Sequence, residues 1–363
     1  MIIRLAAATT TALLLATTPA AATPPRHPRV QQAVDNLTRK HDLPGAQLRL
    51  NGTHVFTSGK GDLGTGAPIP RDSTARIGSI TKTFVATVVL QLAAEGRLTL
   101  EDTVGQHLPG LINRNGNDGN RITVRQLLQH TSGLPEHVGE LEGRGYEKVR
   151  YGHFTAQDLL DIALNHQPDF APGTQWRYSN TGYVVAGLLI EKLTGHRWGE
   201  EVTRRIIKPL GLRDTSVPTE DDLGLPGPHA RGYQILEDGR RADFTRLNTT
   251  AFHAAGAMIS TSADLTRFFD TLVNGDLLPP AQHADLTRTV PSGDGWGYGL
   301  GINARDLPCG VRWWGHAGSV FGWFTYSAVT TTGRKASIIV NQAYLTDAQS
   351  NGVGEAINAA FCP

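Results

Sequence analysis

Residues 78–96 read GSITKTFVATVVLQLAAEG, and this stretch decides the fold. It is apolar on almost every side, it is too long for an ordinary strand, and it closes at Gly96. These features together are typical of a buried helix with a glycine C-cap. Ser79 and Lys82 open the stretch three residues apart, and residues at that spacing lie on one face of a helix. We therefore expect a central helix from Ser79 to Glu95 with a serine and a lysine at its N-terminal end. A lysine is seldom fully buried, so the position of Lys82 indicates a function.

The composition excludes several classes of protein. With 363 residues, a net charge of +1 and 39% hydrophobic residues, the chain is long and apolar enough for a sizeable globular core. A nucleic-acid binder or a protein held on a membrane surface would show clustered basic residues, and the sequence has no such cluster. Cysteine and histidine residues do not occur at the spacing of metal ligands, so we expect no metal and no other cofactor.

The N-terminus predicts export. Residues 1–22, MIIRLAAATTTALLLATTPAAA, combine Arg4 with a short apolar run and a small-residue end, which is typical of a secretory signal peptide. A membrane anchor is the alternative, but a spanning helix needs about 20 predominantly apolar residues. We expect a secreted, soluble protein without a membrane anchor, and a flexible lead-in over residues 23–32. In an exported protein, the only two cysteines, Cys309 and Cys362, are expected to form a disulfide.

Strand patterns occur near both ends of the chain, and helical patterns lie between them. After a helix over about residues 30–41, two alternating stretches flank Asn51-Gly52, which is a strong hairpin signal. TAQDLLDIALNH and TGYVVAGLLIEKLTG in the middle fit helices. Beyond about residue 295, VRWWGHAGS, FTYSAVTT and ASIIVNQA again read as strands, and residues 347–361 read as a final amphipathic helix.

This order predicts an α+β fold. Both chain ends, about 33–78 and 295–363, would supply strands to one antiparallel sheet flanked by helices. A mostly helical part, about 79–294, would be inserted beside the sheet. We expect a cleft where the two parts meet.

The Ser-x-x-Lys pattern of Ser79 and Lys82 fits a nucleophile and its base. At the start of a helix, the Ser79 hydroxyl faces the cleft, and its unpaired N–H can stabilise an oxyanion. Burial lowers the pKa of a lysine, and a neutral amine on the same helix face can take the serine proton. The alternative is structural, with Ser79 as an N-cap and with the Lys82 amine extending to water. No other lysine of the chain has a serine three residues before it.

Tyr178, Ser179 and Asn180 form the second motif. Alternate residues of an extended stretch point to the same side, so Tyr178 and Asn180 can face one cleft. A phenol near Lys82 could ionise and carry a proton, and an amide could bind a substrate carbonyl. The alternative is that Asn180 or Thr181 caps the helix that follows.

The third motif is WGHAGS, residues 314–319. Its two glycines allow another backbone to come close to the strand, and a substrate peptide could pair along that edge. The N–H of Ser319 could then supply a second donor to an oxyanion. The alternative is that His316 ends a strand and that the glycines form a bulge.

Together, these motifs resemble those of the serine β-lactamase and penicillin-binding-protein superfamily, in the branch with Tyr-x-Asn and His-x-Gly. The chain is most similar to the secreted, soluble D-alanyl-D-alanine carboxypeptidases, with class C β-lactamases as relatives. The similarity starts near residue 30, reaches the C-terminus, and includes ITVRQLLQHTSGLP, YSNTGYVVAGLLIEKLTG, AAGAMIST and GYGLG. The pairing of Cys309 with Cys362 also resembles that branch. The resemblance implies a β-lactamase/transpeptidase-like α+β fold and a single catalytic domain over residues 33–363.

The resemblance implies an acyl-enzyme mechanism on D-Ala-D-Ala-type peptides, without metal or cofactor. Ser79 would attack the amide or a β-lactam carbonyl, while Lys82 and Tyr178 would share the general-base and general-acid work. The N–H groups of Ser79 and Ser319 would form the oxyanion hole. The expected partners are peptidoglycan stem peptides or other D-amino-acid peptides, with β-lactams as covalent inhibitors or substrates. We expect a monomer that binds no nucleic acid.

The substrate-binding residues that the resemblance implies are Asn180, Asn303, His316, Ala317, Gly318 and Ser319. Asn180 would orient the substrate, and His316 would tune the field and the proton relay. The carboxypeptidases carry a threonine where this chain has Ala317, and they carry an arginine for the substrate carboxylate where it has Asn303. Each lost hydrogen bond to a charged group costs about 1.5–3 kcal/mol, which Ser319 could offset in part. Alternatives are therefore a class C-like β-lactamase, or a D-stereospecific endopeptidase, aminopeptidase, amidase or esterase. A non-catalytic penicillin-recognising or wall-binding module is a further alternative, which the intact Ser79, Lys82 and Tyr178 oppose.

Overall fold

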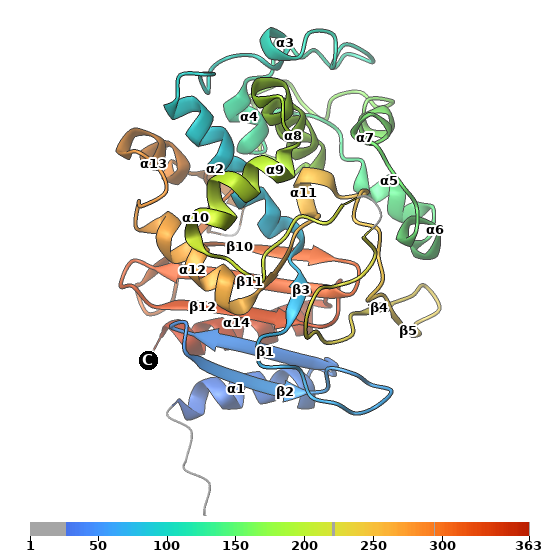
Figure 1. The fold of residues 1–363 in the computed structure, drawn as a ribbon, viewed down its shortest axis with the longest axis vertical. Coiled ribbons are helices and arrows are strands. Elements are labelled where there is room, and N and C mark those ends of the chain that lie inside the picture. Colours follow the sequence, from blue (N-terminus) through green and yellow to red (C-terminus); the bar gives the residue numbers. More distant parts are fainter. Residues whose placement is uncertain (1–26, 220–221, 294, 363) are drawn as a thin grey trace, which may run out of the picture.

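The computed structural model describes residues 27–219, 222–293 and 295–362 (Figure 1). The predicted signal peptide and residues 23–26 of the predicted lead-in lie outside this part of the chain. Within the described part, no helix combines the length and the hydrophobicity that are needed to cross a bilayer.

The central helix is α2 (Thr81–Ala94), and the chain leaves it through Gly96 in a left-handed conformation (φ +70°), as the sequence predicts. Every residue from Thr81 to Leu90 is buried, because apolar elements surround the helix. The helix begins later than predicted, since Gly78–Ile80 form a separate 3-10 turn, η1. Ser79 therefore lies in a tight turn that leads into the helix, while Lys82 lies in the first turn of the helix itself.

Among the described residues, eight strands form one antiparallel sheet in the order β2-β1-β12-β11-β10-β9-β8-β7. They are β1 (Gly45–Leu50), β2 (His54–Gly59), β7 (Val290–Gly293), β8 (Trp296–Tyr298), β9 (Asn303–Asp306), β10 (Arg312–Val320), β11 (Trp323–Thr330) and β12 (Lys335–Val340). The two chain ends meet where β1 pairs with β12, which confirms the predicted sheet. Its C-terminal part starts at Val290 rather than near residue 295, because β7 pairs with β8.

The predicted hairpin at Asn51-Gly52 connects β1 to β2. Both residues take left-handed backbone conformations (φ +51° and +74°), which asparagine and glycine adopt more easily than other residues. The chain can therefore reverse in a few residues, and the register of the sheet edge is set locally.

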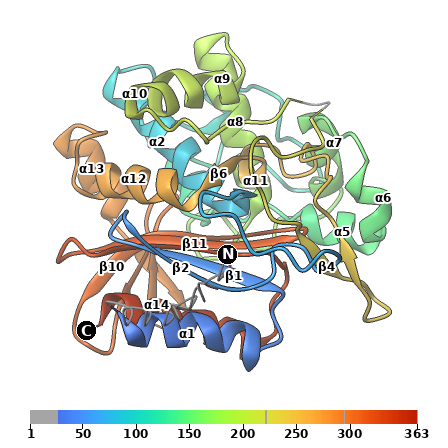
Figure 2. The ribbon, with the colours of Figure 1, turned by 60° about the horizontal axis from the view of Figure 1, so that its bottom comes forward.

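Helices cover both faces of the sheet (Figure 2). α1 (Pro28–Arg39) and α14 (Asp347–Phe361) pack together on one face, and α2 and α12 (Ser262–Val273) lie on the other. α14 has the predicted bounds. α1 begins at Pro28, inside the segment that was expected to be a flexible lead-in, because a proline in the first helical turn loses no hydrogen bond.

The helical part packs on α2 through α8 (Asn180–Thr194), a second long apolar helix (Figure 1). The other helical elements are α3 (Val104–His107), α4 (Val124–Leu128), α5 (Val138–Gly143), α6 (Tyr146–Arg150), α7 (Ala156–Ala163), α9 (Trp198–Val202), η2 (Thr203–Ile207), α10 (Lys208–Leu210), α11 (His253–Gly256) and α13 (Pro280–Thr287). Two short strand pairs complete it, β3 (Thr74–Arg76) with β6 (Ile259–Thr261) and β4 (Tyr233–Ile235) with β5 (Arg241–Asp243). Because β3 directly precedes η1, its pairing with β6 fixes the chain that leads into Ser79.

A disulfide joins Cys309, between β9 and β10, to Cys362 at the end of α14. The two cysteines are 53 residues apart in the sequence. On the chain-entropy model, restricting the unfolded chain across a loop of this size stabilises the fold by about 4 kcal/mol.

Replacing Cys309 and Cys362 together with serine should lower the free energy of unfolding by roughly 2–5 kcal/mol. Urea unfolding followed by tryptophan fluorescence measures the change, with and without a reductant. The reductant should bring the wild type to the stability of the variant and should leave the variant unchanged. Equal unfolding midpoints for the oxidised wild type and the variant would show that the bridge does not stabilise the fold.

Candidate active site

Lys82 contacts three oxygen atoms at the mouth of α2. Its Nζ lies 3.0 Å from Ser79 Oγ, 2.7 Å from Asn180 Oδ1 and 2.7 Å from the carbonyl oxygen of Ala255. An amide oxygen and a backbone carbonyl can only accept hydrogen bonds. A neutral Lys82 amine therefore donates its two N–H groups to these two oxygens, and its lone pair remains for the hydroxyl of Ser79.

Burial makes this neutral amine available near physiological pH. The Lys82 side chain is fully buried, and desolvation lowers its pKa from 10.5 to about 7, although the negative charge of Glu136 acts in the opposite direction. The alternative in which Lys82 extends to water is therefore wrong. Ser79 remains partly exposed, so a substrate can reach its hydroxyl.

Tyr178 lies beside the same pair and keeps its proton. Burial raises the pKa of its phenol well above the ordinary value, and a hydrogen bond with the Ser79 side chain opposes this only in part. The Nζ of Lys82 lies 4.8 Å from the centroid of the Tyr178 ring. Of the two groups, Lys82 is the one that loses its proton near neutral pH, and Tyr178 is a hydrogen-bond donor.

Glu136 is a residue of this site that the sequence analysis missed. Its Oε2 accepts the backbone N–H of Asn180 at 2.5 Å, and its Oε1 accepts that of Val138 at 2.8 Å. The carboxylate thus accepts the unpaired N–H at the start of α8, although the two residues are 44 positions apart in the sequence. No local spacing pattern could have shown this contact. The N-cap position belongs to Ser179 and not, as the alternative had it, to Asn180 or Thr181. The Asn180 side chain binds Lys82 instead.

Two glycines bring the Ser79 turn against β10. A Cβ on Gly318 would lie 1.9 Å from the carbonyl oxygen of Ile77. A Cβ on Gly78, which has φ +50°, would lie 2.8 Å from the carbonyl oxygen of Ser319. β10 pairs with β11 in an unbroken register from Trp313 to Val320, so Gly315 and Gly318 do not form a bulge and His316 does not end the strand, as the alternative had it. The backbones that carry Ser79 and Ser319 are therefore neighbours, as two oxyanion donors must be.

His316 is buried and neutral. Burial and the positive charge of Lys82 lower its pKa to about 3. Its Nδ1 lies 2.5 Å from the carbonyl oxygen of Ala317, which can only accept, so the hydrogen-bond network assigns the proton to this nitrogen. Nε2 then accepts a hydrogen bond from the hydroxyl of Tyr298 at 3.0 Å. His316 thus joins β10 to β8 and brings no charge into the cleft.

Ala317 and Ser319 of β10, together with Asn303 of the neighbouring strand β9, form what we call the β10 wall. All three side chains are electrically neutral. Among the described residues, no arginine or lysine forms a hydrogen bond or ion pair with these three side chains. Arg305, the arginine closest to Asn303 in sequence, lies over the Trp296 ring at 4.9 Å from its centroid. The Ser319 hydroxyl is buried and has no hydrogen-bond partner in the part of the chain that the structure describes. The wall therefore offers neutral groups alone at the place where the resemblance predicts a carboxylate site.

Comparison with known proteins identifies the family. A model described as Beta-lactamase matches residues 30–357. The chain belongs to the Beta-lactamase family. It is a serine hydrolase of the β-lactamase and penicillin-binding-protein type, so the predicted superfamily and its α+β fold are confirmed.

Three similar proteins frame this member of the Beta-lactamase family. Over 339 residues the chain is 28% identical to penicillin-binding protein 4 of Amycolatopsis lactamdurans, which covers 88% of this chain and 86% of that protein. The solved D-stereospecific amidohydrolase from Streptomyces sp. is 39% identical, with a TM-score of 0.84 and coverage of 93% and 99% of the two chains. The D-amino acid amidase from Ochrobactrum anthropi SV3 is 26% identical, with a TM-score of 0.80 and coverage of 92% and 99%.

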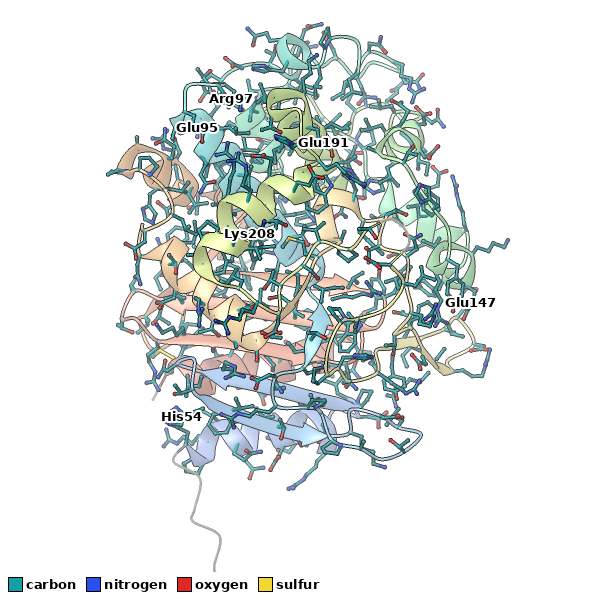
Figure 3. The ribbon with its side chains drawn as sticks, viewed as in Figure 1. His54, Glu95, Arg97, Glu147, Glu191 and Lys208 are labelled. Carbon is teal, nitrogen blue, oxygen red and sulfur yellow. A yellow bond between two sulfur atoms is a disulfide. The ribbon has the colours of Figure 1, made fainter. Side chains whose placement is uncertain are left out.

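A cavity of about 730 Å³ in this Beta-lactamase family member is not lined by Ser79. Glu191 and Lys208, both labelled in Figure 3, line it together with His253 of α11. The same short helix supplies the Ala255 carbonyl that binds Lys82. The hydrogen bonds of Lys82, and not this cavity, mark the active site.

Gly318→Ala should separate the Ser79 turn from β10. Because its Cβ would collide with the Ile77 carbonyl, we expect kcat/KM on an activated ester to fall by roughly 100-fold or more. Gly354→Ala is the matched control, since Gly354 lies in α14 with open space for a Cβ. The control should keep wild-type activity and should be equally stable or up to about 1 kcal/mol more stable. Wild-type activity in Gly318→Ala would contradict the close approach.

Proposed function

We propose that the chain is a D-stereospecific amidohydrolase. It acts on amides or esters of D-amino acids that carry a free α-amino group, through an acyl-enzyme on Ser79. The observation that carries this choice of substrate is the carboxylate of Glu136 beside the catalytic groups, together with a neutral β10 wall.

Glu136 is placed to meet a positive charge on the substrate. It binds the backbone N–H of Asn180, whose side chain binds Lys82, so it lies close to the groups around Ser79. Its charge also raises the pKa of both Lys82 and Tyr178. Its side chain is 30% exposed, in contrast to the fully buried Lys82. Each of its oxygens holds one backbone N–H and keeps a further lone pair for a ligand. An α-ammonium is bonded to the carbon next to the carbonyl that Ser79 attacks, so the acyl part of the substrate can bring it to this carboxylate.

The β10 wall gives a free substrate carboxylate little support. A carboxylate bound there would lack the charged hydrogen bond that an arginine supplies, which is worth about 1.5–3 kcal/mol. The carboxylate of Glu136 would also repel it. These two effects favour a substrate with a positive acyl part and a neutral leaving part over a substrate with a free C-terminus.

Similarity supports the same choice. The D-stereospecific amidohydrolase from Streptomyces sp. shares 39% identity over almost the whole of both chains. The D-amino acid amidase from Ochrobactrum anthropi SV3 has the same fold at 26% identity. The preference for the D configuration rests on these two relatives, and the preference for a free amine rests on Glu136.

The proposed mechanism uses Lys82 as the first base. Its lone pair takes the Ser79 proton while Ser79 Oγ attacks the substrate carbonyl, and the N–H groups of Ser79 and Ser319 hold the oxyanion. Asn180 holds the amine in place and orients the substrate. The proton then passes through the Tyr178 hydroxyl to the leaving nitrogen or oxygen, which departs as the acyl-enzyme forms. Water releases the acid by the reverse transfers.

The predicted D-Ala-D-Ala carboxypeptidase is the second candidate, and the similarity to penicillin-binding protein 4 favours it. The same acylation groups would then react with peptidoglycan stem peptides and with β-lactams. Export through residues 1–22 and the monomeric state also remain predictions. Fluorescent penicillin, with Ser79→Ala as the blank, tests whether a β-lactam acylates Ser79.

Acylation should depend on the neutral form of Lys82. Because its pKa is lowered to about 7, the rate should rise with pH through about pH 7 and stay level above it. The measurement is the pH profile of kcat/KM on an N-acetylated ester, whose own charge does not change in this range. Lys82→Arg, which stays charged, should be inactive throughout. A flat wild-type profile between pH 5 and 9 would exclude Lys82 as the base.

Glu136→Gln tests the substrate class. Wild type should hydrolyse D-phenylalanine amide and its methyl ester faster than their N-acetylated forms and faster than the L-enantiomers. The glutamine can still accept the Asn180 N–H, but it loses the charge, so kcat/KM on the free-amine substrates should fall by roughly 10–100-fold.

The N-acetylated ester is the internal control for Glu136→Gln, because both substrates experience the same helix cap and the same Lys82. Its kcat/KM should change much less than that of the free amine. Equal losses on both substrates would show that Glu136 does not recognise the ammonium. Faster hydrolysis of D-Ala-D-Ala peptides than of D-amino-acid amides by the wild type would favour the carboxypeptidase.

A further inference from the structure

The His-Thr-Ser-Gly turn at residues 130–133, directly after α4, takes no part in the chemistry described above. His130 has a left-handed backbone conformation, with φ +62°. A residue other than glycine seldom adopts this conformation unless its surroundings require it. The side chain of His130 is also almost completely buried, at 1% exposed. A buried imidazole with an unusual backbone, close to the site, calls for a physical reason.

His130 holds the chain on both sides of Tyr178. The backbone N–H of Arg177 donates to the His130 carbonyl at 3.0 Å. The backbone N–H of Ser179 donates to Nδ1 of the imidazole at 3.2 Å. The ring of His130 also lies against the ring of Tyr178, with 4.2 Å between their centroids. One residue thus fixes the backbone before Tyr178, the backbone after it, and one side of its ring.

The left-handed backbone is what allows the double contact. It turns the chain at the end of α4, so the carbonyl and the imidazole of His130 both face the strand-like segment that carries Tyr178. The next residues continue the contact, because the N–H of Gly173 donates to the Thr131 carbonyl and the N–H of Asp169 donates to the Gly133 carbonyl. The whole turn therefore supports the loop before Tyr178.

The imidazole of His130 acts as an acceptor and not as a proton carrier. Since Nδ1 accepts from Ser179, the proton of the neutral ring is on Nε2. Nε2 is buried and has no hydrogen-bond partner among the described residues. The rings of Tyr183 and Tyr298 lie at 5.4 and 4.6 Å. Burial, the largest cause, and the charge of Lys82 hold the pKa of His130 well below its usual value, so the ring stays in this form.

We propose that His130 is a positioning residue that fixes the Tyr178 hydroxyl beside Ser79 by accepting the Ser179 N–H on its Nδ1. The inference rests on the proposed role of Tyr178 in proton transfer. The His-Thr-Ser-Gly turn lies outside the Ser-x-x-Lys, Tyr-x-Asn and His-x-Gly motifs, and this proposal gives it a role in the site. Without the Nδ1 acceptor, the Ser179 N–H would be buried and unpaired, and the segment would shift to find another partner.

Two variants separate the acceptor from the backbone conformation. Asparagine and glycine both tolerate the left-handed backbone, but asparagine alone keeps an acceptor, since its Oδ1 is as many bonds from Cα as Nδ1 of histidine is. His130→Gly should lower kcat by roughly 100-fold with little change in KM, because the phenol moves while the substrate-binding groups stay. His130→Asn should keep most of the wild-type kcat. Equal losses in both variants, or wild-type kcat in His130→Gly, would overturn the proposal.

Tyr178→Phe separates this inference from the proposed function. If Tyr178→Phe keeps wild-type activity, the proposed role of Tyr178 fails. If Tyr178→Phe is inactive while His130→Gly is fully active, the positioning role of His130 fails and the role of Tyr178 stands.

A measurement on the wild type does not depend on how the variants fold. Nitrogen-15 NMR of the histidine side chains reports the tautomer of His130, with the signal assigned by its loss in His130→Asn or, failing that, by selective labelling. The proposal requires a neutral ring with the proton on Nε2 between pH 6 and 8. A proton on Nδ1, or a charged ring in this range, would overturn it, since Nδ1 could then not accept from Ser179.

Discussion

The burial of a single amine, that of Lys82, is the constraint on which the rest of the site depends. A buried amine must have its N–H groups satisfied, because an unpaired polar group in the interior destabilises the fold. The acceptors come from two elements that are far apart in the sequence, Asn180 at the start of α8 and Ala255 in α11. The three helices α2, α8 and α11 must therefore meet at this point. The same burial that requires these contacts also lowers the pKa of Lys82 and turns it into a base.

A second segment, residues 130–137, organises the other half of the site. Its His130, Pro135 and Glu136 accept one hydrogen bond from each residue between 177 and 181 except Tyr178. Glu136 accepts the backbone N–H of Asn180 at the start of α8, while the Asn180 side chain binds Lys82. Tyr178 and Asn180 thus reach the site for different reasons. Tyr178 lies beside Ser79 because the backbone on both sides of it is held, and Asn180 reaches Lys82 because Glu136 holds its backbone.

The sequence predicts those features whose cause is local. Helix α14 and the hairpin at Asn51-Gly52 follow from periodicity and turn residues, and the spacing of Ser79 and Lys82 follows from the geometry of one helix turn. The sequence analysis misses the residues of the site whose contacts are with distant parts of the chain. Glu136 and His130 act on residues 44 and 49 positions away. The Ala255 carbonyl belongs to the backbone, so no side-chain pattern reports it. The 3-10 turn at Ser79 also depends on a distant partner, because Gly78 packs closely against β10, and the sequence analysis therefore missed it.

The charges around Ser79 connect the substrate to the base. Near neutral pH, Tyr178 and His316 are neutral, while Glu136 raises the pKa of Lys82. An ammonium that pairs with Glu136 cancels part of this effect, so the neutral fraction of Lys82 increases when such a substrate binds. A substrate carboxylate in the same place would do the opposite, because it adds negative charge and keeps Lys82 protonated. A free α-amino group would therefore contribute both to binding and to the supply of the base, which a recognition site on the β10 wall could not do.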